Sequence, residues 1–101
     1  MAVIVLLSSC GASSSDPNTV RVYSGRQYDL EQAFTRFTEQ TGIKVEFQFG
    51  NDAELRERIA AEGENTPADV FISVDAGNLV KAADQGLFRS LDAPALDAAI
   101  P

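Results

Sequence analysis

Histidine is absent from the sequence, and cysteine occurs once, as Cys10. These shortages exclude a histidine base, a histidine metal ligand, an internal disulfide and a multi-cysteine zinc site. Basic residues are also few, with 8 Lys and Arg against 15 Asp and Glu and a net charge of −7. An acidic chain without a basic run argues against binding to nucleic acid or to anionic membrane surfaces.

The motifs of common enzyme classes are missing as well. The chain has no GxGxxG, no P-loop and no GxSxG sequence, so neither a nucleotide-dependent enzyme nor a serine hydrolase is expected. Apolar residues make up 45% of the 101 residues, which is typical of one small globular domain. We therefore expect a binding protein and not an enzyme.

The N-terminus combines an apolar run, AVIVLL over residues 2–7, with the sequence LSSC that ends at Cys10. The run is much shorter than the about 20 residues that span a bilayer, and it is typical of a secretory signal. LSSC resembles the bacterial lipobox, which predicts a signal peptide over 1–9, a lipid anchor on Cys10 and a flexible tether over 10–19. The alternative is that residues 2–7 form a core strand and Cys10 is an ordinary small residue.

From residue 20 onward, strand and helix patterns alternate. Alternating strands and helices predict an α/β fold with a three-stranded parallel sheet and flanking helices. Residues 43–49 alternate apolar and polar, as an edge strand does, whereas residues 70–74 are almost continuously apolar, as an interior strand is. The predicted strands cover 20–23, 43–49 and 70–74, and the predicted helices cover 30–41, 52–62 and 76–85, followed by a short Ala-rich helical pattern within 92–101.

Helix-ending and packing signals accompany these segments. Asp29 with Gln32 is suited to cap the helix over 30–41, and Gly42 to end it. In the helix over 76–85 we expect Leu79, Val80 and Ala83 to face inward. Residues after that helix, Leu87, Phe88 and Leu91, are expected to pack on the sheet edge.

Candidate ligand-binding residues follow two of the predicted strands. In an open α/β sheet, ligands bind beyond the carboxyl ends of the strands. Arg26, Gln27 and Tyr28 follow the first strand, and the sequence 75–77, Asp-Ala-Gly, opens the third helix. By residue type alone, Tyr28 would be a packing residue like Tyr23, and Arg26 a solvated one. By the same criterion, Asp75 would be a helix cap, and Glu57, Glu62 and Glu64 a solvated acidic face.

Several segments together resemble the bacterial periplasmic ferric-iron-binding proteins, the solute receptors of ABC importers. The segments are VRVYSGRQYD, TGIKV, EG…TPADVF and DAGNL, and the resemblance covers residues 20–101. The family has a two-lobed periplasmic-binding-protein fold of type II and is about three times longer than this chain. The resemblance therefore implies the first lobe, incomplete, with a hinge and second lobe missing from the chain. We expect residues 20–101 to be part of an N-terminal lobe.

The resemblance also implies site residues and partners. It makes Tyr28 a metal ligand for Fe(III), while Gln27 stands where the family has a histidine and Val74 where some members have a glutamate. Arg26, Gln27, Asp75, Ala76 and Gly77 are implied as ligand- or anion-binding residues, for instance for carbonate. It further implies a monomer that delivers iron to ABC importer permease subunits, in the periplasm or on the outer face of the cytoplasmic membrane.

Three alternatives remain open from the sequence. A receptor for a small anion or a phosphonate would also be consistent with Arg26 and Gln27. An aspartate-based phosphotransfer domain would use Asp75 as its acceptor. A structural lipoprotein fragment would bind no ligand.

Overall fold

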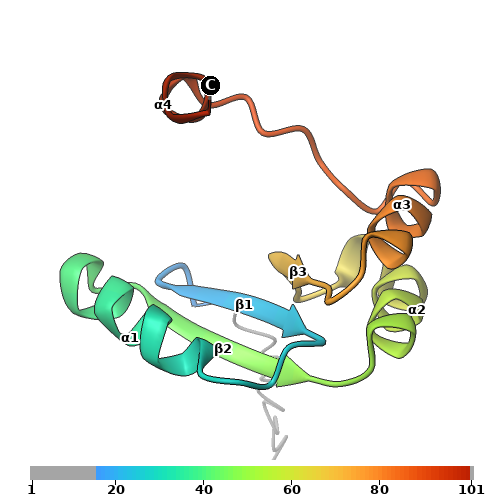
Figure 1. Cartoon of the computed structure of the whole chain (residues 1–101), viewed down its shortest axis with the longest axis horizontal. Coiled ribbons are helices and arrows are strands. Elements are labelled where there is room, and N and C mark those ends of the chain that lie inside the picture. Colours follow the sequence, from blue (N-terminus) through green and yellow to red (C-terminus); the bar gives the residue numbers. More distant parts are fainter. Residues whose placement is uncertain (1–15, 101) are drawn as a thin grey trace, which may run out of the picture.

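A computed structural model describes residues 16–100, in which strands and helices alternate along the chain (Figure 1). This order confirms the predicted α/β fold. The first strand begins one residue earlier than predicted, and the third ends at Ile72 instead of Val74. The elements of the described part are β1 (Thr19–Ser24), α1 (Leu30–Thr41), β2 (Lys44–Phe49), α2 (Asp52–Glu62), the 3-10 turn η1 (Gly63–Asn65), β3 (Val70–Ile72), α3 (Ala76–Asp84) and α4 (Pro94–Ala99).

Within residues 16–100, the strands form a three-stranded parallel sheet in the order β2-β1-β3. Val22 of β1 is aligned with Phe47 on one side and with Val70 on the other. The alternating pattern of β2 correctly predicted an edge strand. The prediction of an interior third strand was wrong for the described residues: β3 lies at the other edge, and Val70 is 42% exposed. A continuous apolar run indicates potential for burial, but it does not identify the neighbour that buries it.

The two helices on either side of β2 begin differently. Asn51 caps α2, because its side-chain oxygen accepts a hydrogen bond from the Ala53 N–H at 2.9 Å. Asp29 was predicted to cap α1 in the same way, but it has a φ of 53° and makes no side-chain capping bond with any described residue. Gly42 ends α1 as predicted, with a φ of 74° in the left-handed region that glycine tolerates.

The described core lies between the sheet and α2. Tyr23 of β1 packs with Leu55 and Ile59 of α2, and the neighbouring half-buried side chains are Ala68, Phe71 and Leu87. Leu87 therefore packs as predicted, whereas Phe88 and Leu91 are exposed. In α3 the buried side chain is Ala82, not Leu79, Val80 or Ala83 as predicted. Figure 1 shows α3 beside α2, and α4 at the end of an extended segment away from the sheet.

The segment before β1 is described from Asp16. Residues 16–18 form a turn in which the Thr19 N–H donates to the Asp16 carbonyl at 3.1 Å, and the Lys44 N–H donates to the Asn18 carbonyl at 2.8 Å. Sheet hydrogen bonding thus begins inside the segment predicted as a tether. The predicted signal peptide and Cys10 lie outside the described residues. Among residues 16–100, none of the helices is both long and apolar enough to cross a membrane.

Candidate functional site

The carboxyl ends of the three strands meet at one edge of the sheet, called here the rim and formed by residues 24–28, 49–52 and 72–77. Two backbone hydrogen bonds tie its parts together. The Gly25 N–H donates to the Ile72 carbonyl at 2.9 Å, and the Gly50 N–H donates to the Ser24 carbonyl at 3.2 Å. The loops that follow β1, β2 and β3 therefore begin at the same level, where ligands bind in open α/β sheets.

The loop after β1 carries three of the predicted site residues. Ser24 is buried, and its hydroxyl oxygen accepts from the Arg26 N–H at 3.0 Å and lies 2.9 Å from the Arg26 carbonyl oxygen. This local turn fixes the start of the loop. Arg26, Gln27 and Tyr28 are exposed, and Tyr28 is 87% exposed. The interpretation of Tyr28 as a packing residue is therefore wrong for the described part of the chain.

The loop after β3 leads into α3 through Asp75. Its carboxylate accepts from the Asn78 N–H at 2.8 Å and from the Asn78 side-chain amide at 3.0 Å. These hydrogen bonds, the backbone one first, lower the pKa of Asp75 below its ordinary value. Asp75 is thus a helix cap. Ala76 and Gly77 form the exposed first turn of α3, and their predicted contact with a ligand stays a prediction.

Asp52 is a rim residue that the sequence did not single out. Its side chain is buried, and Oδ2 accepts from the Val74 N–H at 2.9 Å and lies 2.9 Å from the Ser73 hydroxyl. Oδ1 has no hydrogen-bond partner among the described residues. In the sequence Asp52 looks like an ordinary acidic residue of a helix first turn, and no local signal indicates Ser73, which lies 21 residues further along.

The rim brings the two sets of predicted residues to the same edge but does not join them directly. Within residues 16–100, no hydrogen bond or ion pair connects Arg26, Gln27 or Tyr28 with residues 75–77. The described residues also contain no group of three His, Cys, Asp or Glu side chains that could hold a metal ion. To a cation the rim offers the exposed phenol of Tyr28 and the carboxylate of Asp75, which already accepts from Asn78, and to an anion it offers the guanidinium of Arg26.

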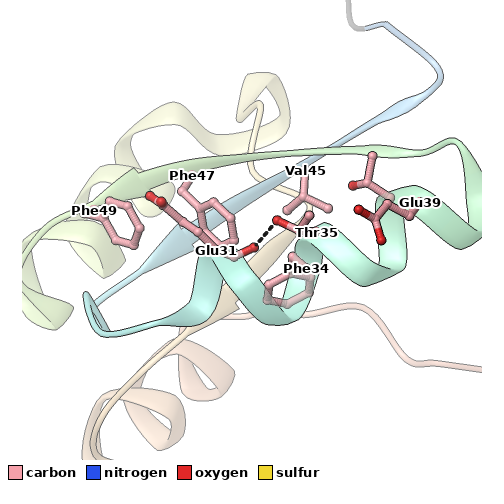
Figure 2. Close-up of a pocket in the computed structure, with 8 residues that line it drawn as sticks. Glu31, Phe34, Thr35, Glu39, Val45, Phe47 and Phe49 are labelled. Carbon is pink, nitrogen blue, oxygen red and sulfur yellow. Dashed lines mark hydrogen bonds between the residues drawn. The ribbon is translucent and has the colours of Figure 1, made fainter.

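A groove of about 410 Å³ lies between α1 and β2, away from the predicted site residues. Figure 2 shows Phe34, Val45, Phe47 and Phe49 side by side in this groove. The rings of Phe34 and Phe47 meet edge to face at 5.4 Å between centroids. The groove is half apolar, and its charged lining side chains are acidic, so it does not suit a small anion. Its remaining lining residues are Glu31, Thr35, Thr38 and Glu39.

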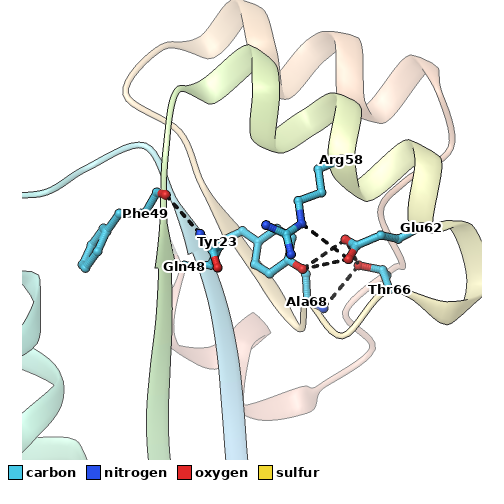
Figure 3. A network of polar contacts seen from close by, with 7 residues as sticks. All are labelled: Tyr23, Gln48, Phe49, Arg58, Glu62, Thr66 and Ala68. Atoms are coloured by element: carbon cyan, nitrogen blue, oxygen red, sulfur yellow. Dashed lines mark hydrogen bonds and ion pairs between the residues drawn. The ribbon is translucent and has the colours of Figure 1, made fainter. Parts of the chain in front are cut away.

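Tyr23, the other tyrosine of the chain, is held in a polar network (Figure 3). Its hydroxyl donates to the Glu62 carboxylate, with both oxygens at 3.0 Å, and the Arg58 guanidinium carbon lies 5.3 Å from its ring centroid. Burial, together with the Glu62 carboxylate, raises the pKa of Tyr23 above its ordinary 10.0. Tyr23 is thus a packing residue, as predicted.

Glu62 in this network departs from the prediction of a solvated acidic face. Its carboxylate also accepts from the Thr66 hydroxyl at 3.1 Å and pairs with Arg58 at 3.6 Å. Its side chain is 23% exposed, whereas that of Glu57 is 68% exposed. The prediction therefore holds for Glu57 and fails for Glu62, because the partner Tyr23 lies 39 residues away in the sequence.

Comparisons with known proteins agree on one family. The model of the bacterial extracellular solute-binding proteins matches residues 17–101. The chain is 38% identical to iron uptake protein A1 of Synechocystis over 95% of this chain and 29% of that protein, and 34% identical to the Fe(3+)-binding periplasmic protein of Serratia marcescens over 92% and 28%. The solved structure of Trichodesmium IdiA (FutA) in complex with iron and citrate is similar, with 42% identity and a TM-score of 0.72 over 79% of this chain and 26% of that one. The chain thus spans under a third of these relatives.

Proposed function

This chain belongs to the bacterial extracellular solute-binding protein family, and from that premise we propose that its protein captures ferric iron for an ABC importer. The observation that carries the proposal is the exposed phenol of Tyr28 at the rim, in a chain whose relatives are named for iron uptake and Fe(3+) binding. Residues 20–101 are part of the first lobe, and the ligand is enclosed when a second lobe closes over it about a hinge.

The chemistry of Tyr28 suits a ferric ion. Fe(III) is small and hard, so anionic oxygen ligands bind it best, and a bound metal ion promotes loss of the phenol proton. Gln27 offers a neutral amide, which is a weaker ligand for Fe(III) than an imidazole or a carboxylate. Tyr28 is therefore the ligand that this part of the chain contributes, and further ligands come from outside the rim.

An anion bound with the iron has a place beside Tyr28. The first N–H groups of an α-helix lack partners within the helix, and they attract anions. Asp29 makes no side-chain capping bond with described residues at the start of α1, so these groups are not capped by that side chain. Arg26 lies three residues before this position and is exposed. We propose that carbonate, or a carboxylate of a chelator such as citrate, binds here.

The proposed ferric site is tested by Tyr28→Phe in the complete gene product. Loss of the phenolate is expected to weaken ferric binding at least about tenfold, which is about 1.4 kcal/mol. Tyr23→Phe is the matched control, because it removes the same hydroxyl from a buried position, and it is expected to leave the ferric affinity unchanged. Equal affinities of wild type and Tyr28→Phe would contradict the proposal, as would binding of phosphate without any response to ferric iron.

We also propose that Cys10 carries a lipid that holds the protein at the outer face of the cytoplasmic membrane, where a monomer meets its permease. The proposal follows from the LSSC sequence, since lipid chains provide membrane affinity that this acidic chain lacks. Cys10→Ser is expected to move the protein from the membrane fraction to the soluble fraction of fractionated cells. Continued membrane association of that variant would contradict the anchor.

A further inference from the structure

Asp52 joins the two loops that carry the predicted ligand residues. Its Oδ2 receives the Val74 N–H at 2.9 Å and lies 2.9 Å from the Ser73 hydroxyl, which places it under the loop that leads to Asp75. Its Oδ1 lies against Gly25, the residue before Arg26. One side chain at the start of α2 therefore contacts the rim loop that follows β1 and the rim loop that follows β3.

Gly25 shows how close this approach is. An ideal Cβ built on Gly25 would lie 1.5 Å from Asp52 Oδ1, where no side chain fits. The φ of Gly25 is not among the positive values of the described glycines, so the backbone conformation itself does not demand glycine. Glycine is required at this position because the Asp52 carboxylate occupies the space.

The burial of Asp52 is costly for a residue that only packs. The side chain is 6% exposed and Oδ1 has no hydrogen-bond partner among residues 16–100. A buried polar atom without a partner reduces the free energy of unfolding, whereas a smaller or apolar side chain would avoid this loss. What the carboxylate provides in return is a fixed connection between the two loops.

We propose that Asp52 is a positioning residue, which holds residues 25–28 at a fixed place relative to residues 73–77 so that the ligand groups of the rim are pre-organised. This proposal rests on the proposed ferric site for its ligand. Residues that orient metal ligands without touching the metal typically affect metal affinity about 10- to 100-fold. Asp52→Ala is accordingly expected to weaken ferric binding by about that factor.

The test compares three single variants of the complete gene product. Glu54→Ala is the matched control, because it removes the same charge from the first turn of the same helix at an exposed position. Asp52→Asn retains an oxygen that can accept from Val74 and Ser73, and it is expected to recover most of the affinity lost in Asp52→Ala. Ferric affinity and the ferric–phenolate absorption band at saturating iron are measured for each variant.

A residue that only stabilises the fold would lower the unfolding midpoint but leave the absorption band of the folded, iron-saturated protein unchanged. We expect Asp52→Ala to shift this band and Glu54→Ala to leave it in place. An unchanged band and affinity in Asp52→Ala would overturn the proposal.

A double-mutant cycle applies the same test from the Gly25 side. Gly25→Ala is expected to displace the Asp52 carboxylate and weaken ferric binding, and adding Asp52→Ala removes the clash. The double variant should therefore lose less affinity than the sum of the two single losses. Strictly additive losses would overturn the proposal.

Hydrogen exchange of the Val74 amide distinguishes a failure of this proposal from a failure of the proposed ferric site. If the Val74 amide of Asp52→Ala loses its protection from hydrogen exchange, Asp52 connects the two loops. If the wild-type protein in addition binds no ferric iron, the proposed function is overturned while this connection between the loops stands. Unchanged protection in a folded Asp52→Ala variant would overturn the link itself.

Discussion

The two faces of the sheet are packed very differently. On the face of Tyr23, helix α2 contributes buried Leu55 and Ile59 and the polar network around Glu62. On the opposite face, where Phe47 points, α1 covers β2, and none of the twelve described residues of α1 is buried. The helix on the first face contributes buried side chains, whereas the helix on the second face borders an open groove, which is lined by apolar side chains together with Glu31 and Glu39 (Figure 2).

The side chains that hold the rim in place come from both faces of the sheet. The buried residues of β1 are its last three, next to the rim, and Asp52 at the start of α2 contacts two rim loops. Of the three β1 residues, Tyr23 lies on the α2 face, whereas Val22, which is aligned with Phe47, and Ser24 lie on the opposite face, so both faces contribute buried side chains next to the rim. The α1 face contributes the helix start beside Arg26 and Tyr28, but none of the described residues of α1 itself is buried.

The largest expected effect on stability is found by comparing one leucine from each face of the sheet. Leu55→Ala removes a side chain that is 4% exposed, and it is expected to lower the free energy of unfolding by about 3 kcal/mol. Leu30→Ala truncates a half-buried side chain of α1, and it is expected to cost about 1 kcal/mol, because less surface leaves an apolar environment. Urea unfolding of both variants measures the difference, and equal losses would show that α1 is as well packed as α2.

A second comparison uses one arginine from each face. Buried Arg56 donates from Nε to Asn78 at 3.2 Å and from Nη1 to Gln85 at 3.0 Å, which connects α2 with α3. Arg56→Ala is expected to lower the free energy of unfolding by about 2 kcal/mol. Arg36→Ala, on the exposed side of α1, is expected to stay within about 0.5 kcal/mol of wild type. An unchanged free energy of unfolding in Arg56→Ala would contradict the role of Arg56 in joining α2 to α3.

The smallest effect distinguishes the two tyrosines. Tyr23→Phe removes the hydroxyl that binds Glu62, and it is expected to cost about 1 kcal/mol. Tyr28→Phe is expected to leave the free energy of unfolding unchanged, because Tyr28 is exposed. The expected order is the reverse of that for iron binding, where Tyr28→Phe has the larger effect. Thermal or urea unfolding of both variants at neutral pH measures their effects on stability.

The same pair predicts a pH dependence at high pH. Because the pKa of Tyr23 is raised above 10.0 in the folded protein, the unfolded chain loses this proton at a lower pH than the folded chain. The contribution of the Tyr23 hydroxyl to the free energy of unfolding is therefore complete below pH 10, and it is lost as the pH rises through the pKa of Tyr23 in the folded state. The advantage of wild type over Tyr23→Phe should shrink above pH 10, and a constant difference would argue against the raised pKa.

Local sequence signals predicted the helices and strands well, but they predicted less well which neighbours each element packs against. The bounds of α1 and α2 and the edge position of β2 follow from apolar spacing, from Gly42 and from Asn51, whereas Asp29 makes no side-chain capping bond with described residues. The exposure of Val70 does not, because a buried strand and an uncovered one have the same apolar pattern. At the site, the strand-to-helix junctions marked residues 26–28 and 75–77, but the partners of Asp52 lie 21 and 22 residues away. Contacts of that separation have no periodic signature.

The strand order also bears on how the molecule folds. Thr19 is paired with Lys44, 25 residues away, whereas Val22 is paired with Val70, 48 residues away. Closing the longer loop costs more chain entropy, and contacts that are distant in sequence generally form later. We therefore expect β1 and β2 to pair first and β3 to join them afterwards. Since β3 carries the loop that contacts Asp52, the rim becomes complete only in that last step of assembly.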